Sequence, residues 1–115
     1  MTGLGVVPRE QAKDPLVLAI DVGTSSARAF VYDAGGRMVA GWGARQPYSA
    51  HTTGDGGVEI DGDALADLTK RCVGETLAAM GPEVERLIAV GCDTFWHSLI
   101  GVERDHSAAT PVYTW

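Results

Sequence analysis

One short segment holds most of the side chains that could act on a phosphate group. Residues 18–28 read LAIDVGTSSAR and contain a carboxylate, a glycine, three hydroxyls and a guanidinium: Asp21, Gly23, Thr24, Ser25, Ser26 and Arg28. The glycine lets backbone N–H groups approach a phosphate, the hydroxyls add donors, and the guanidinium can neutralise charge. A carboxylate can hold a hydrated magnesium ion. The segment therefore predicts a phosphate-binding turn, although a turn whose Asp and Ser only satisfy its own amides would use the same residue types.

An apolar strand and two hairpins must position this turn. Residues 16–20 read LVLAI, a continuous apolar run typical of a strand that is buried on both faces. Residues 27–32 and 37–42 are also strand-like, and a Gly-rich turn separates them. Two successive hairpins are the simplest interpretation, and they place Asp21 at the open end of the first strand.

A helix is predicted after the hairpins. Its apolar residues recur at steps of three or four and form one stripe: Leu65, Leu68, Cys72, Val73, Leu77 and Met80. Asp61 or Asp63 can cap the first turn of this helix. Gly81 and Pro82 end the helix, since proline cannot continue it.

A second apolar run, residues 87–92, predicts another buried strand. Because a helix that joins two parallel strands crosses over right-handedly, this strand should lie beside the first. Asp21 and Asp93 would then be neighbours at the carboxyl ends of the strands, where ligands bind in such sheets. Residues 98–103 and 111–113 are expected to be further extended pieces. The order of elements predicts an α/β fold, a mixed sheet with one crossover helix.

The flanking segments lack a regular apolar pattern. Residues 1–15 are interpreted as a loose, flexible leader, so the folded domain is assigned to residues 16–115. Residues 44–57 are rich in Gly, Thr, Ser and His and are interpreted as an excursion over the surface. Trp42 stands in loop-like surroundings and is expected at the surface.

Composition and charge exclude several classes of protein. The 115 residues include 9 Lys and Arg against 15 Asp and Glu, a net charge of −6, which disfavours nucleic-acid binding. Apolar residues make up 45%, as in ordinary globular domains and unlike disordered chains. No apolar run approaches the roughly 18 residues needed to span a membrane, so the cytoplasm is the expected compartment. Cys72 and Cys92 lack nearby paired ligands, and both are interpreted as buried small apolar residues.

Several segments, in order, resemble the FGGY carbohydrate kinases of the actin-like ATPase superfamily. Residues 18–39 look like the first phosphate-binding hairpin of that superfamily. Residues 57–61 (GVEID) are similar to the segment before the first long helix of the family, and residues 88–91 (IAVG) resemble the strand that leads to its sugar pocket. FWHS at residues 95–98 stands where many members have a Met-His-Ser-like stretch that contacts substrate. Residues 110–115 (TPVYTW) look like the strand before an Asp-x-Arg segment of the family.

The resemblance implies a ribonuclease H-like fold, with this chain as a truncated N-terminal portion of the first lobe. It also implies ATP-dependent phosphorylation of a sugar or sugar-acid hydroxyl, with Mg²⁺ as cofactor. Carried over by position, Asp21 would organise the magnesium, and residues 23–26 with Arg28 would face the transferring phosphate. Trp96 and His97 would line the sugar pocket. Trp96 replaces the usual Met, or the Arg of glycerol-specific members, which disfavours glycerol. The Met-His-Ser-like context and the Thr-Trp ending favour gluconate or a related sugar acid, with xylulose next.

Other interpretations stay open beside the kinase. The resemblance places the catalytic base, the second phosphate hairpin and the adenosine pocket in segments that this chain does not contain, so the chain alone is expected to be inactive. It could instead be a non-catalytic sugar-binding or complementing fragment that associates through exposed apolar surface. A ribonuclease H-like nuclease, with Asp21, Glu59 and Asp93 around two metal ions, is less favoured because of the negative charge. His97 could also be a packed core residue.

Overall fold

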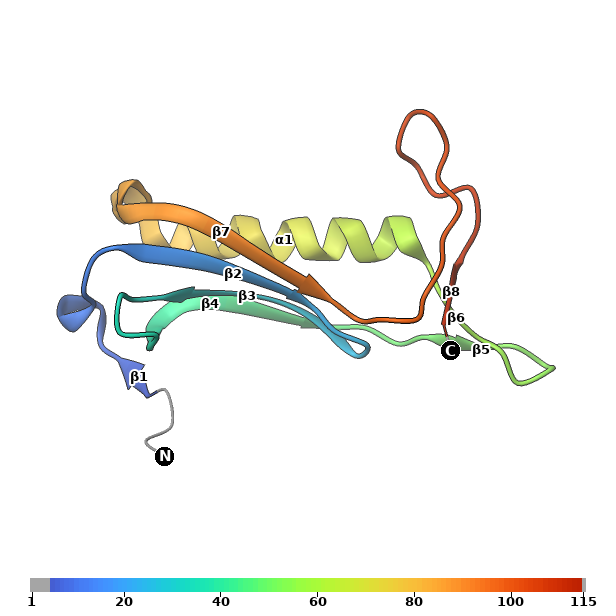
Figure 1. Cartoon of the computed structure of the whole chain (residues 1–115), viewed down its shortest axis with the longest axis horizontal. Helices are drawn as coiled ribbons and strands as arrows, with labels where there is room; N and C mark the ends of the chain where they lie inside the picture. The colour runs from blue at the N-terminus through green and yellow to red at the C-terminus, as the bar shows by residue number, and fades with distance from the viewer. Residues whose placement is uncertain (1–4, 115) are drawn as a thin grey trace.

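The computed structural model of the chain describes residues 5–114, and a five-stranded sheet forms its larger part. Neighbouring strands follow the order β1-β4-β3-β2-β7. The strands of this sheet are β1 (Val6–Val7), β2 (Leu16–Val22), β3 (Ser26–Tyr32), β4 (Met38–Pro47) and β7 (Leu87–Thr94). Strands β2, β3 and β4 are antiparallel neighbours, whereas β2 pairs with β7 in parallel. The two predicted hairpins and the mixed sheet with its crossover helix are confirmed (Figure 1).

Helix α1 (Gly62–Met80) lies along one face of the sheet (Figure 1). It begins where predicted, because the Asp61 carboxylate accepts a hydrogen bond from the Ala64 N–H at 3.0 Å. It ends at Gly81, whose φ of +56° favours glycine. Among residues 5–114, no helix is long and apolar enough to cross a membrane.

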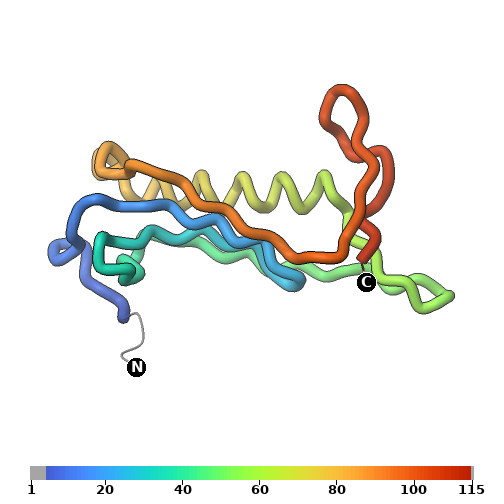
Figure 2. The backbone as a smooth tube through the Cα atoms, viewed as in Figure 1, coloured from blue at the N-terminus to red at the C-terminus, as the bar shows by residue number. Residues whose placement is uncertain are grey.

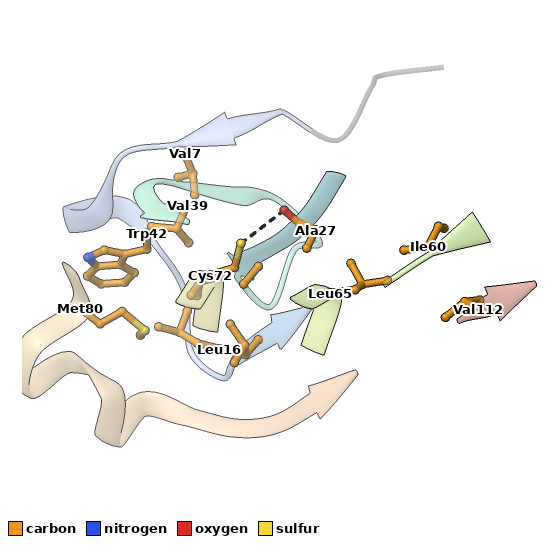
Figure 3. Packing of buried hydrophobic residues seen from close by; sticks show 13 residues of the cluster. Val7, Leu16, Ala27, Val39, Trp42, Ile60, Leu65, Cys72, Met80 and Val112 are labelled. Atoms are coloured by element: carbon orange, nitrogen blue, oxygen red, sulfur yellow. Dashed lines mark hydrogen bonds between the residues drawn. The ribbon is translucent and has the colours of Figure 1, made fainter. Parts of the chain in front are cut away.

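Small side chains let α1 approach strand β3 closely. The Cys72 thiol donates to the Ala27 carbonyl at 3.3 Å, and the Thr76 hydroxyl contacts the Ala29 carbonyl at 3.2 Å. Figure 3 shows Cys72 reaching Ala27 across the apolar core. The apolar core therefore lies between α1 and the face of β2, β3 and β4 that the helix covers.

A second, smaller sheet lies beyond the carboxyl end of β2. It has the order β5-β6-β8. Its strands are β5 (His51–Thr52), β6 (Val58–Ile60) and β8 (Val112–Tyr113). Single bridges at Leu99–Tyr113 and Val102–Ala108 shape the segment before β8 into a narrow hairpin, which projects from the sheet (Figure 2). The predicted extended pieces around a polar turn are therefore present, although mostly as bridges.

The N-terminal segment is more ordered than predicted. Strand β1 pairs in parallel with β4, with Val7 opposite Val39, and Val7 is buried. The short 3₁₀ helix η1 (Arg9–Gln11) follows it. The interpretation of residues 1–15 as a loose leader is therefore wrong for residues 5–15, and residues 1–4 lie outside the described part. Two paired residues are too few to show a period, so the sequence carried no signal for this strand.

Trp42 is also placed differently from the prediction. Its side chain is only 3% exposed, and the guanidinium groups of Arg9 and Arg86 lie over the indole at 5.7 and 5.9 Å. Strand β4 extends through Pro47, so the expected surface excursion from residue 44 begins too early. Contacts between residues far apart in the sequence bury this part of β4, and local composition does not record them.

Strand β7 is exposed, although its apolar run predicted a buried strand. It is an edge strand, and α1 covers β3 and β4 rather than β7. Ile88 and Val90 are exposed, and so is Cys92, whose predicted burial is wrong; Cys72 is buried as expected. The radius of gyration of 16.4 Å exceeds the about 13 Å expected for a compact domain of this length. The chain is accordingly flat, with extents of 51 × 36 × 18 Å.

Candidate functional site

The turn between β2 and β3 presents unpaired backbone N–H groups. The Gly23 N–H donates to the Ser26 carbonyl at 2.9 Å and closes the turn. Thr24 and Ser25 form its exposed tip, and within residues 5–114 no hydrogen bond uses the N–H of either. A cavity of about 230 Å³ opens beside Thr24. Free amides at an exposed turn are the donors that an anionic oxygen needs.

Ser26 differs from the two exposed residues of the tip. Its side chain is buried, and its hydroxyl accepts a hydrogen bond from the Arg45 guanidinium at 3.3 Å. The sequence grouped Ser26 with Thr24 and Ser25, but Ser26 is the first residue of β3, and Arg45 of the neighbouring strand bonds its hydroxyl. Of the three predicted hydroxyls, the structure therefore leaves two at the surface of the turn.

Asp21 and Arg28 face each other across the first hairpin. They are register partners, and the Arg28 Nη2 lies 2.8 Å from the Asp21 Oδ2. Their side chains are 41% and 38% exposed, so solvent screens the pair and it adds little stability. Because side chains alternate along a strand, both lie on the sheet face opposite the one that carries Leu18 and the helix. The Arg28 Nε is buried and has no hydrogen-bond partner among the described residues.

Gly23 is the residue that lets Arg28 lie against the turn. A Cβ at this position would stand 3.2 Å from the Arg28 Nη2 and 3.2 Å from the Ser26 carbonyl oxygen. A side chain would therefore require the guanidinium and the turn to shift by a few tenths of an ångström. This gives a steric reason for the glycine that the sequence placed in the phosphate turn.

Asp93 is the neighbour of Asp21 on the other side, as the crossover rule predicted. The two residues are in register across the parallel pair of β2 and β7. The Asp21 carboxyl raises the pKa of Asp93, first by hydrogen bonding and then by its charge. Two carboxyls and one guanidinium thus meet at the carboxyl end of the sheet, and the acidic groups exceed the basic one.

Trp96 and His97 follow β7, and within residues 5–114 no hydrogen bond or ion pair joins them to Asp21 or Arg28. The Trp96 side chain is 79% exposed, and its ring meets that of His97 edge to face, with centroids 6.1 Å apart. A largely apolar cavity of about 540 Å³ lies nearby, and its lining includes Phe95, Leu99 and Ile100 but neither of the two predicted residues. The packed-core interpretation of His97 finds no support either, because the chain at His97 takes a φ of +59° in an exposed bend.

Glu59 does not join Asp21 and Asp93. It lies in β6 of the smaller sheet, opposite His51 and Tyr113. Among residues 5–114, no group of three or more His, Cys, Asp or Glu side chains is arranged to hold a metal ion. The three-carboxylate arrangement expected for the nuclease alternative is therefore absent from the described residues.

Tyr48 is a contact of the turn that the sequence did not single out. Its hydroxyl donates to the Gly23 carbonyl, and its backbone N–H donates to the Ser25 carbonyl at 3.0 Å. The residue directly follows β4, in the segment interpreted as a surface excursion. Only the pairing of Ser26 with Pro47 brings it beside the turn, so no local pattern could have identified it.

Known proteins similar to this chain are carbohydrate kinases. No profile of a known protein family matches the chain. The glycerol kinase of Ectopseudomonas mendocina (strain ymp) is 37% identical over 75 residues, 65% of this chain. That of Rhodospirillum centenum (strain ATCC 51521 / SW) is 35% identical over 77 residues, 67% of this chain. Each match covers 15% of the relative's own length.

Solved structures agree with these relatives. The gluconate kinase from Lactobacillus acidophilus superposes with a TM-score of 0.73 at 25% identity, over 87% of this chain and 19% of that one. A ligand-bound xylulose kinase from Lactobacillus acidophilus gives the same values. The chain belongs to the FGGY carbohydrate kinase family. It spans about 15% of the length of the curated FGGY relatives that it matches.

The fold of this FGGY chain is the ribonuclease H-like fold of the actin-like ATPases. The xylulose kinase from Rhodospirillum rubrum, at 18% identity, has a TM-score of 0.76 over 86% of this chain and 20% of that one. At that identity the likeness concerns the fold alone. It confirms the predicted fold class across most of the chain.

Proposed function

We propose that this chain provides the first phosphate-binding turn of an ATP-dependent carbohydrate kinase. Such an enzyme transfers a phosphoryl group from ATP to a hydroxyl of a sugar or sugar acid. The observation that carries the proposal is the open turn at the end of β2, where the free amides of Thr24 and Ser25 adjoin the half-exposed Asp21 carboxylate. Phosphoryl transfer depends mainly on positioning and charge stabilisation, which fixed amides and charges can contribute.

The chemistry of Asp21 fits a magnesium ion. Magnesium prefers oxygen ligands and usually keeps several waters, so one accessible carboxylate at a strand end suits it. When bound, this ion would offset the negative charge of the phosphates. Asp21 would hold and orient the ion's water shell, with the Asp93 carboxyl beside it as a further oxygen donor.

Thr24, Ser25 and Arg28 are the residues proposed to contact phosphate. Thr24 and Ser25 offer backbone N–H and hydroxyl donors at the exposed tip of the turn. Arg28 adds positive charge beside the turn and partly offsets the negative charge of Asp21, with which it pairs. Ser26 is left out of this set, because its hydroxyl is buried against Arg45.

The proposed acceptor is a gluconate-like or xylulose-like sugar, bound near Trp96 and His97. An exposed indole can stack on the C–H face of a sugar ring or chain. The gluconate and xylulose kinases among the structural neighbours support this choice, whereas the curated relatives are glycerol kinases. Saturation-transfer NMR with gluconate, xylulose and glycerol tests it on this chain. Transfer to glycerol alone would contradict the proposal.

Complete turnover is proposed only for a protein that also contributes a base and a second phosphate clamp. The chain spans about 15% of its curated relatives, so we expect no sugar phosphorylation by the chain alone. We place it in the cytoplasm, as expected for sugar metabolism. The exposed apolar residues of β7 favour self-association, which size-exclusion chromatography measures; a stable monomer at high concentration would refute it.

A titration of the chain with magnesium pyrophosphate, followed by ¹H–¹⁵N NMR, tests the phosphate site directly. We expect saturable shifts in the amides of Gly23, Thr24 and Ser25, and a several-fold loss of affinity in Asp21→Asn when magnesium is present. Without magnesium the Asn variant should bind no more weakly than wild type, since it has lost a repulsive charge. The exposed helical Asp67→Asn variant is the matched control. Shifts confined to other regions would refute the proposed function.

A further inference from the structure

The phosphate turn is braced from one side by a single residue. Strand β4 pairs with β3 up to Ser26 and Pro47, and the next residue, Tyr48, therefore lies alongside the turn. Tyr48 makes two hydrogen bonds to it: its hydroxyl donates to the Gly23 carbonyl, and its N–H donates to the Ser25 carbonyl at 3.0 Å. Within residues 5–114, no other residue outside the turn donates to both of these carbonyls.

These bonds determine which backbone groups remain free. The Ser26 carbonyl accepts from the Gly23 N–H, so three carbonyls of the turn are paired. Because the Gly23 oxygen points toward Tyr48, the Thr24 N–H of the same peptide group points to the other side and has no partner among residues 5–114. The Ser25 N–H, which belongs to the next peptide group, is also unpaired within these residues. A peptide group with its oxygen fixed inward has its N–H directed to the other side, which is the arrangement that an anion requires.

The ring of Tyr48 is held in place by the start of α1. Tyr48 lines a cavity of about 160 Å³ together with Ile60, Ala64 and Leu65, and it packs against the apolar core. Burial raises the pKa of the Tyr48 phenol, so the hydroxyl stays protonated and able to donate at neutral pH. The brace is therefore tied to the folded core and not to another loop.

We propose that Tyr48 is a positioning residue for phosphate binding: it fixes the Gly23 carbonyl and so presents the Thr24 amide of the same peptide group to the phosphate, while its bond to the Ser25 carbonyl holds the other side of the turn in place. The proposal rests on the proposed function, because it assigns Tyr48 a task within that same site. Tyr48 acts through the turn and does not itself touch the phosphate.

The variant Tyr48→Phe removes only the hydroxyl bond to Gly23. We expect lower ¹⁵N order parameters and faster hydrogen exchange in residues 23–25 without ligand, and about fivefold weaker binding of magnesium pyrophosphate, as the loss of one hydrogen bond implies. Tyr32→Phe is the matched control, since no hydrogen bond of the Tyr32 hydroxyl occurs within residues 5–114. A merely structural role would lower the thermal midpoint without selectively loosening the turn.

Replacing Tyr48 with 4-aminophenylalanine provides a second variant, because it restores a donor at the same place. It should recover turn order and affinity, and it remains informative if Tyr48→Phe does not fold. Unchanged order parameters and affinity in Tyr48→Phe, with a wild type that binds, would overturn the role of Tyr48 alone. A wild type that fails to bind pyrophosphate would overturn the proposed function, while the ligand-free measurements still decide whether Tyr48 sets the turn.

Discussion

The two ends of the five-stranded sheet differ in how completely their charged side chains are paired. At the end nearest the chain's N-terminus, Arg86 pairs with Asp14 and Glu83, each at 2.7 Å, and also donates to the Ala12 carbonyl. The buried Asp33 carboxylate accepts from the Lys13 and Gly35 N–H groups and from the Arg37 guanidinium at 2.6 Å. Every charge named at this end has partners.

At the opposite end, where β2 and β7 finish, the charged side chains are not fully paired. Asp21 and Asp93 share a single guanidinium, that of Arg28, whose buried Nε is unpaired. Within residues 5–114, the Thr24 and Ser25 amides of the adjacent turn have no hydrogen-bond partner. Groups that the chain does not satisfy are available to a ligand, whereas satisfied groups stabilise the fold. The comparison therefore supports the proposal that one end of the sheet stabilises the fold and the other end binds phosphate.

The largest test of this division is the removal of the indole of Trp42. Trp42→Ala should destabilise the chain by about 3–5 kcal/mol, because it empties a buried site and leaves the guanidinium groups of Arg9 and Arg86 without their aromatic contact. Urea unfolding followed by circular dichroism measures the loss. Below the transition, pyrophosphate shifts in the turn should persist.

The matched control for Trp42→Ala is Trp96→Ala, the same substitution at a 79% exposed position near the other end. It should change stability by less than about 0.5 kcal/mol. Equal losses in the two variants would contradict the division of the molecule into a stabilising end and a binding end.

A smaller effect is expected from the buried ion pair. Asp33→Asn should lower the thermal midpoint by roughly 5–10 °C at pH 7, since the amide cannot replace the paired carboxylate. The hydrogen bond from the Arg37 side chain, with N–H bonds from Arg37, Lys13 and Gly35, holds the pKa of Asp33 well below its usual 3.8. The stabilisation is thus fully present above that value and is lost as the pH falls below it.

Thermal midpoints of wild type and Asp33→Asn at several pH values test the sign of this dependence. The difference between the two proteins should be constant from pH 7 to pH 5 and shrink below about pH 4. A difference that grew on acidification would show that the Asp33 carboxylate does not stabilise the folded chain.

The binding end was the easier one to predict from the sequence. Asp21, Gly23 and the hydroxyls lie within six residues, and one topological rule brings Asp93 beside Asp21. The hairpins and α1 follow from local apolar patterns. The burial of Ser26 was not predicted, because it involves Arg45 of another strand, and local composition does not record that contact.

The stabilising end could not be predicted, because distant residues build it. Val7 pairs with Val39, and the guanidinium groups of Arg9 and Arg86 lie over the Trp42 ring. No periodic pattern in the local sequence predicts either contact. The contact of Tyr48 with the turn was not predicted for the same reason. The exposure of β7 was missed because an apolar run has the same composition whether or not another element covers it.

The smallest effect should come from the excess charge at the binding end. Asp93→Asn removes a carboxyl whose pKa is raised by Asp21, so it should raise the thermal midpoint at pH 7 by roughly 1–3 °C. A raised pKa means that ionising Asp93 destabilises the folded state, so stability falls as the pH rises through that pKa. The gain from Asp93→Asn should therefore vanish well below pH 4, opposite to the dependence at Asp33.

The Arg28→Gln background sharpens this last prediction. Without the guanidinium, the two carboxyls repel each other more strongly, so Asp93→Asn should raise the midpoint more in Arg28→Gln than in wild type. Equal gains in the two backgrounds would mean that Arg28 does not offset the acidic pair. A larger gain would indicate that the chain keeps a destabilising charge where a cation and a phosphate are proposed to bind, and that Arg28 only partly compensates for it.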